Sequence, residues 1–157
     1  MDANTRAQAQ AADATLAASR ALLGVVARSV ATALEIVTLP QFRVLVVLST
    51  IGPMRMGSLA ERMGAIPSTF SRFIDRMVVG GWVERSSSPD SRREVLIELT
   101  ASGRKLVEEV TTSRRKDIAG ILSAMTPEQQ VASTRAFQAF ADAAGETPAA
   151  DLLALGL

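Results

Sequence analysis

The 157-residue chain contains no cysteine, no histidine and no tyrosine. Without cysteine it has no disulfide and no thiol redox sensor, and the loss of both cysteine and histidine removes the common transition-metal ligands. Catalytic schemes built on histidine or cysteine are excluded for the same reason. No residue of the sequence supplies a catalytic base for the remaining acids, such as Glu108 and Glu109. We therefore expect no enzyme activity, no metal site and no cofactor.

An uninterrupted apolar run of about 18 residues is also missing, so no membrane span is expected. The polar, alanine-rich start does not resemble a signal peptide, which favours a cytoplasmic protein. Net charge is only +1, but the charges are unevenly placed. The segment from Arg55 to Arg93 contains seven arginines and four acidic residues, whereas Arg135 is the only basic residue beyond Thr126. The chain is basic in its middle and acidic near its end, and 48% hydrophobic residues are enough for a core.

Helical spacing of apolar residues predicts a long first helix over Asp13–Val37 with a frayed start before it. Thr38 and Gln41 match a capping box that opens a second helix, which Gly52-Pro53 ends. A short third helix is expected from about Met56 or Ser58 to Met63, with Ser58 as a candidate cap.

The next segment carries the most specific pattern. Pro67 suits the first position of a fourth helix, and Gly80-Gly81 suits its end. Trp82–Arg85 and Glu94–Leu99 read as two strands joined by the polar tip SSSPDSRR. Thr100 and Thr126 then cap a fifth and a sixth helix. The order predicts a mainly α fold with a small β-hairpin wing, that is, a winged helix-turn-helix plus a helical dimerisation region.

Two features point to nucleic acid. On the fourth helix, Phe70, Phe73, Ile74 and Met77 form an apolar face, and the other face is polar. The polar face is suited to contact DNA in the major groove, and the alternative is that it is an ordinary solvent-exposed face. Arg92 and Arg93 at the hairpin tip suit an adjacent minor groove, although a solvated loop with a local pair to Asp90 is the alternative. The candidate DNA-binding residues are Ser68, Thr69, Ser71, Arg72, Arg76, Asp90, Arg92 and Arg93.

The end helices carry more apolar surface than the winged core needs, and Leu152, Leu153 and Leu155 close the chain. Exposed apolar patches of this kind mark oligomer interfaces, and packing of the helices within one chain is the alternative. We expect residues 1–37 and 101–157 to form a dimerisation region and residues 38–100 to form the DNA-binding lobe.

The series LPQFRVLVVL, SLAERMG, PSTFSRFIDRM, GGWVER and RREVLIELTASGRKL resembles the MarR family (multiple antibiotic resistance regulators) over nearly the whole chain. The resemblance implies a cytoplasmic homodimer that binds a pseudo-palindromic double-stranded DNA operator, usually as a repressor, and that a small aromatic or lipophilic ligand releases. By position it assigns groove reading to Ser68, Thr69, Ser71 and Arg72, and the wing-tip role to Arg93.

The sequence departs from the family pattern at three places. Ser91 stands where Asp is usual, with Asp90 displaced by one residue. Ile66 and Arg55 stand where capping residues usually precede the fourth and third helices. A missing cap lowers helix stability by roughly 0.5–2 kcal/mol, so we expect the third and fourth helices to be more mobile than in relatives. Without cysteine, the thiol-oxidation branch of the family is excluded.

The signal that releases the protein from DNA is then expected to be a non-covalent ligand. A pocket is predicted where the first, second and fifth helices meet, with Leu23 and Val26 in its wall and Arg20 or Arg43 at its edge. A collapsed pocket in a constitutive DNA binder is the alternative. For the whole chain, the alternative function is a winged-helix module that contacts proteins or ligands without binding an operator.

Overall fold

The computed structural model describes residues 3–88 and 91–145, and the side chains of 4–87 and 95–145. The elements run in this order: α1 (Ala3–Leu34), α2 (Leu39–Ile51), β1 (Met54–Arg55), α3 (Met56–Arg62), α4 (Pro67–Val79), β2 (Val83–Ser88), β3 (Ser91–Leu99), α5 (Ala101–Leu122) and α6 (Pro127–Ala143). The fold is mainly helical with one small antiparallel sheet, as the sequence predicted. The terminal leucines 152, 153 and 155 lie outside the described residues.

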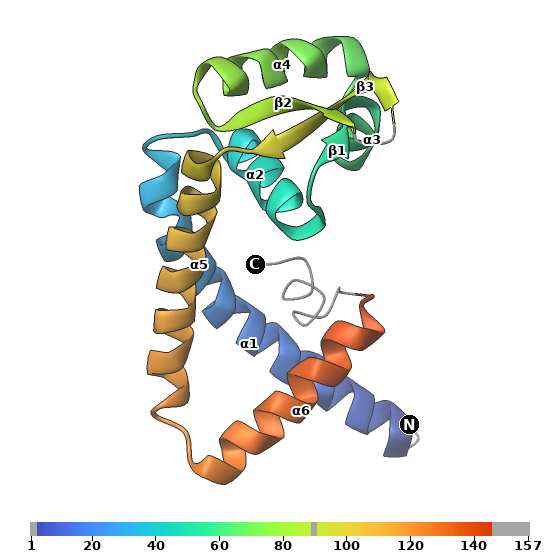
Figure 1. The fold of residues 1–157 in the computed structure, drawn as a ribbon. Helices are drawn as coiled ribbons and strands as arrows, with labels where there is room; N and C mark the ends of the chain where they lie inside the picture. The colour runs from blue at the N-terminus through green and yellow to red at the C-terminus, as the bar shows by residue number, and fades with distance from the viewer. Residues whose placement is uncertain (1–2, 89–90, 146–157) are drawn as a thin grey trace.

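An upper lobe contains α2, α3, α4 and the sheet, and α1 and α5 contact each other near this lobe and diverge below it (Figure 1). The strand order is β1-β3-β2, with Met54 opposite Ile97 and Val83 opposite Leu99. A core of fully buried side chains joins the layers of the lobe: Leu45 from α2, Leu59 from α3, Ile74 and Met77 from α4, and Ile97 from β3. Burial on this scale is what holds α4 in place.

The predicted caps are largely confirmed. Thr38 and Thr126 both form capping boxes, each with a glutamine three residues on. Thr100 caps α5 by accepting a hydrogen bond from the Gly103 N–H at 3.1 Å. Ser58 as the cap of α3 was wrong, because α3 begins at Met56 and Arg55 precedes it without a side-chain cap.

Other boundaries differ from the prediction. α1 begins at Ala3 rather than near Asp13, since its alanine-rich start has a high helix propensity, and it ends at Leu34. Residues 35–37 turn toward the Thr38 cap instead of continuing the helix. The two-residue strand β1 was not predicted, and β2 and β3 reach further into the polar tip than the sequence indicated.

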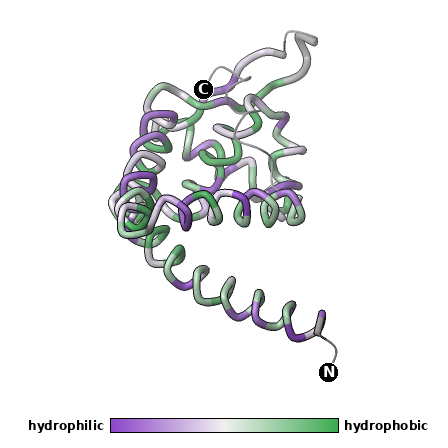
Figure 2. Tube along the Cα trace, turned by 90° about the horizontal axis from the view of Figure 1, so that it is seen from below, coloured by the Kyte–Doolittle hydropathy of each residue, from purple (hydrophilic) through white to green (hydrophobic). Residues whose placement is uncertain are grey.

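The lower helices are sparsely covered. Figure 2 shows the N-terminal part of α1 running away from the rest of the chain. Leu23 of α1 and Phe137 and Phe140 of α6 are more than half exposed, and α6 buries no residue in this structure. Packing of all three helices within one chain, the alternative left open above, is therefore not what the described residues form.

By length and composition alone, the helix over Asn4–Leu34 is long and apolar enough to cross a membrane. The segment carries Arg20 and Arg28 inside it, and Arg28 pairs with Asp117 of α5 at 3.2 Å. An arginine near the middle of a bilayer costs about 2.5–3.5 kcal/mol. The ion pair with α5 and the charged residues within the segment together favour a helix that packs on α5 over a membrane span.

Candidate nucleic-acid interface

Helix α4 has well-defined ends. Pro67 occupies its first turn, and Ile66 stands at the N-cap without a side-chain hydrogen bond. At the other end Gly81 adopts a φ of 73°, its N–H donates to the Val78 carbonyl, and the Trp82 N–H donates to the Met77 carbonyl, both at 3.0 Å. This Schellman arrangement stops the helix and turns the chain directly into β2.

The two faces of α4 differ sharply. Phe70, Ile74 and Met77 are buried in the lobe core. Ser68, Thr69, Arg72 and Arg76 are exposed, and Ser71 is half-buried. In Figure 1, α4 is the outermost layer of the lobe, so its polar face points away from the core. A helix about 10–12 Å across fits a major groove about 12 Å wide, and this one leaves hydroxyls and guanidinium groups free to approach base edges.

Aromatic contacts hold one flank of the helix. The Phe70 and Phe73 rings stack with centroids 5.7 Å apart, and the Arg76 guanidinium lies 6.0 Å from the Phe73 centroid. A cation over an aromatic face is stabilised by the negative ring surface. Arg76 is therefore held along the flank of α4, one turn beyond Arg72.

An ion pair between Arg85 and Asp75 joins the wing to α4. Arg85 lies in β2 and Asp75 lies in the middle of α4, and both side chains are about half exposed. This pair was not predicted from the sequence. The two-glycine turn after α4 indicates that β2 runs back along the helix, but it does not specify which side chains pair.

The wing is an antiparallel hairpin with a register irregularity between Ser87 and Ser88. Its far end lies on the same side of the lobe as the N-terminal end of α4 (Figure 1). Asp90 lies outside the described residues, and so do the side chains of Arg92 and Arg93, although the backbone of both arginines belongs to β3. The predicted roles of these three residues stay predictions.

The base of the wing is fixed to α5. The Thr100 hydroxyl donates to the Gly81 carbonyl at 2.6 Å while it caps α5. Gly103 packs against the backbone of Trp82 so closely that a Cβ built there would lie 2.2 Å from the Trp82 carbonyl oxygen. Only glycine fits this position, so the hairpin and α5 meet in one defined arrangement.

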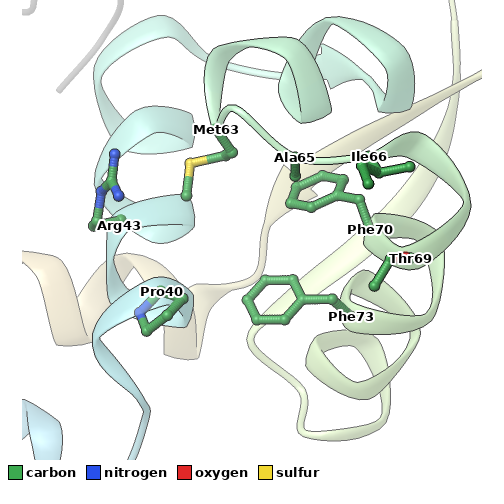
Figure 3. A pocket seen from close by; sticks show the side chains of 8 residues that line it. All are labelled: Pro40, Arg43, Met63, Ala65, Ile66, Thr69, Phe70 and Phe73. Carbon is green, nitrogen blue, oxygen red and sulfur yellow. The ribbon is translucent and has the colours of Figure 1, made fainter.

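The predicted ligand residues do not come together. Arg20, Leu23 and Val26 are exposed on α1. Arg43, on α2, lines an open pocket of about 420 Å³ beside α4 instead (Figure 3). None of the three α1 residues lines that pocket, and its other lining residues, on α2, in the connection after α3 and on α4, were not predicted as pocket residues from the sequence. Within the described ranges, no group of three acidic side chains is placed to hold a metal ion.

The comparisons with known proteins agree with this geometry. The family model described as the MarR family matches residues 37–95. The chain is 30% identical over 95 residues to YfiV of Bacillus subtilis, an HTH-type transcriptional regulator, covering 60% of this chain and 59% of YfiV. It is 32% identical over 100 residues to YwoH of the same organism, another HTH-type transcriptional regulator, covering 64% of this chain and 72% of YwoH.

Among solved structures, RV1404 from Mycobacterium tuberculosis aligns with a TM-score of 0.76 and 44% identity, over 86% of this chain and 92% of RV1404. The match to RV1404 extends beyond the lobe into the end helices, whereas the family model covers the lobe alone. The exposed face of α4, the adjoining hairpin and these relatives lead to one assignment. The chain belongs to the MarR family and is a DNA-binding transcriptional regulator.

Proposed function

We propose that this protein is a repressor that binds a pseudo-palindromic operator as a homodimer and leaves it when a small aromatic or lipophilic ligand binds. The observation that carries the proposal is the exposed polar face of α4, which lies on the outermost layer of the lobe beside the hairpin (Figure 1). In this proposal residues 38–100 form the DNA-binding lobe, and residues 1–37 and 101–157 form the dimerisation region.

On α4, Ser68, Thr69 and Ser71 contact base edges or phosphates, and Arg72 makes the principal base contact. An arginine donates two parallel hydrogen bonds to guanine, and this pairing discriminates between bases by about 1–3 kcal/mol. Arg76, held over Phe73, lies further from the N-terminal end and contacts a phosphate. In this proposal Arg72 recognises the base sequence, and Arg76 positions the protein on the DNA backbone.

At the wing, Arg93 enters the minor groove, and Arg92 and Asp90 shape the tip. A narrow minor groove concentrates negative potential, which favours an inserted guanidinium. The Arg85–Asp75 ion pair supports this role, because it ties the strand that leads to the tip to the helix in the major groove.

Dimerisation is supported by the uncovered apolar side chains of the lower helices. The large exposed hydrophobic residues of α1, α5 and α6 are Leu16, Leu22, Leu23, Val26, Leu34, Ile121, Val131, Phe137 and Phe140. A second copy packed against these faces would remove them from water and place two lobes on one duplex. Two lobes related by a two-fold axis require two half-sites of opposite orientation, which is why a pseudo-palindrome is expected.

Operators are first selected from random DNA, and binding to the best site is then measured by fluorescence anisotropy from low to high salt. The proposal predicts a dyad in the selected sites and an affinity that falls steeply with salt, because phosphate contacts release counterions. Failure to enrich any sequence, together with weak salt-independent binding, would favour the alternative of a winged-helix module that contacts proteins.

A further inference from the structure

Five of the six methionines lie within the described residues, and they differ in how far they are buried. Met77 of α4 is fully buried. Met54, Met56, Met63 and Met125 are half-buried. The chain has no cysteine, so methionine is the side chain that peroxide oxidises most readily. Oxidative modification is therefore expected at the half-buried methionines and not at Met77.

Met63 differs from the other described methionines because it lines the open pocket of about 420 Å³ between α2 and α4. Its side chain points into this space, and its sulfur faces the pocket (Figure 3). The pocket opens to solvent, so a small oxidant reaches the thioether without any movement of the lobe.

Met63 also stands at the turn that joins α3 to α4. It is the C-cap residue of α3, and its N–H donates to the Leu59 carbonyl at 3.0 Å. Gly64 follows with a φ of 63°, which reverses the direction of the chain. The next helix starts behind Ile66, an N-cap without a side-chain hydrogen bond. A chemical change at Met63 therefore acts on the segment that leads directly into α4.

The polar groups around the pocket complement the oxidised side chain. Arg43 of α2 lines the pocket together with Met63, and Thr69 of α4 adds a hydroxyl. The Arg43 side chain is exposed, and no carboxylate in the described part of the chain pairs with it. A guanidinium only donates hydrogen bonds, and a thioether sulfur is a weak acceptor. Oxidation converts that sulfur group into a polar one whose oxygen accepts hydrogen bonds.

We propose that Met63 is a site of reversible oxidation by peroxide, and that its sulfoxide lowers operator binding by displacing the turn before α4. In this step the methionine sulfur attacks one oxygen of hydrogen peroxide, an S–O bond forms and the O–O bond breaks. The second oxygen leaves as water after proton transfer, so the sulfur is oxidised and the peroxide is reduced by two electrons each. The effect on DNA rests on the proposed operator binding, whereas the modification itself does not.

The direction of the effect follows from the surroundings of the sulfur. The aromatic wall of the pocket, formed by Phe70 and Phe73, does not solvate an S–O dipole, so the oxidised side chain moves toward the Arg43 guanidinium. Met63 packs against the core of the lobe in the reduced protein, and this movement withdraws it from that contact. The turn then no longer holds the start of α4 in the position that suits the groove.

The first test locates the modification in the absence of DNA. The folded full-length protein is treated with hydrogen peroxide, and the oxygen content of each methionine is followed by peptide mass spectrometry. Met63 should gain one oxygen early in the reaction, and Met77 should stay unoxidised. Oxidation of Met77 as fast as Met63, or oxidation of Met63 last among the half-buried methionines, would overturn the proposal.

The second test measures operator binding before and after peroxide treatment. Peroxide should weaken binding by roughly tenfold, the scale of one buried polar group that lacks a good partner. Methionine sulfoxide reductases A and B, added together, should restore it, because each reduces one epimer of the sulfoxide. Met63→Leu keeps an apolar side chain of similar volume that peroxide does not oxidise, so this variant should keep its affinity. Met54→Leu, Met56→Leu and Met125→Leu are the matched controls and should lose affinity like the unmodified protein.

A third variant tests the polarity of the side chain without any oxidant. Met63→Gln places an amide oxygen near the position of the sulfoxide oxygen, and it should weaken operator binding before treatment. Binding of the untreated, unmodified protein is measured in parallel, so a failure of the proposed repressor function is seen separately from a failure of the oxidation site. Equal losses in Met63→Leu and the unmodified protein, or full affinity in protein fully oxidised at Met63, would refute the proposal.

Discussion

At the scale of single residues, Gly103 and Gly120 of α5 offer a matched pair. Gly103→Ala should destabilise the fold by about 1–3 kcal/mol, because a Cβ there would lie 2.2 Å from the Trp82 carbonyl oxygen and the backbone must move. Gly120→Ala, with open space around its Cβ, should stabilise the helix by roughly 0.5–1 kcal/mol. Chemical denaturation followed by Trp82 fluorescence measures both.

The contrast in sign is the informative outcome. Two destabilising substitutions of equal size would mean that α5 does not tolerate side chains at either position and that the close approach to Trp82 has no special role. Two neutral substitutions would mean that the base of the wing does not pack on α5 as described.

Local residue chemistry was predictable where it depends on neighbours in the chain. The caps at Thr38, Thr100 and Thr126 follow from a hydroxyl and the N–H groups two or three residues on, so the sequence contains all the information. The Arg85–Asp75 pair and the contact of Gly103 with Trp82 are different. They depend on how separate elements pack, and no short sequence pattern specifies that packing.

At the scale of elements, the wing should give its two neighbouring arginines different roles. Arg92→Ala and Arg93→Ala, made one at a time, should weaken operator binding unequally, with the larger loss at Arg93. The narrowest part of a minor groove has room for only one of the two guanidinium groups. Anisotropy titrations with one operator, repeated at two salt concentrations, measure the difference.

Equal small losses with a shallower salt dependence would contradict insertion. They would mean that each arginine merely neutralises phosphate charge, since that contribution depends on the number of contacts and not on which residue makes them.

Element types were predictable along most of the chain, and boundaries less so. Apolar spacing and glycine stops are strong signals for α2, α4 and α5, and these helices lie where expected. The strand β1 has only two residues, and it exists because Met54 and Arg55 pair with β3. Such a strand carries no periodicity of its own. The start of α1 was missed because polar residues among alanines conceal a good helix former.

At the scale of the whole molecule, the proposed dimer predicts that the exposed side chains of α6 link folding to assembly. Replacing Phe137 and Phe140 by serine should convert the protein toward monomer and lower its melting temperature, because both side chains are more than half exposed without a partner. Ala132→Ser, at an exposed position of the same helix, is the control. Sedimentation and thermal melts at several protein concentrations measure the two effects together.

In the unmodified protein the melting temperature should rise with concentration, as mass action requires for a folded dimer. A double variant that stays dimeric and melts at the same temperature would place the interface elsewhere. The pocket between α2 and α4 is a second property of the whole molecule that sequence could not supply, since it requires these two helices to be placed side by side.

The most direct test of the central claim, that the exposed face of α4 reads operator sequence, uses Arg72→Ala on a panel of operators with single base-pair changes. Affinities of the unmodified and variant proteins are compared at every position of both half-sites. The account predicts a loss of about 1–3 kcal/mol on the best operator and a loss of discrimination at one base pair in each half-site, symmetrically placed. A uniform loss on every operator and on random DNA, or no loss at all, would contradict the assignment of α4 as the reading helix.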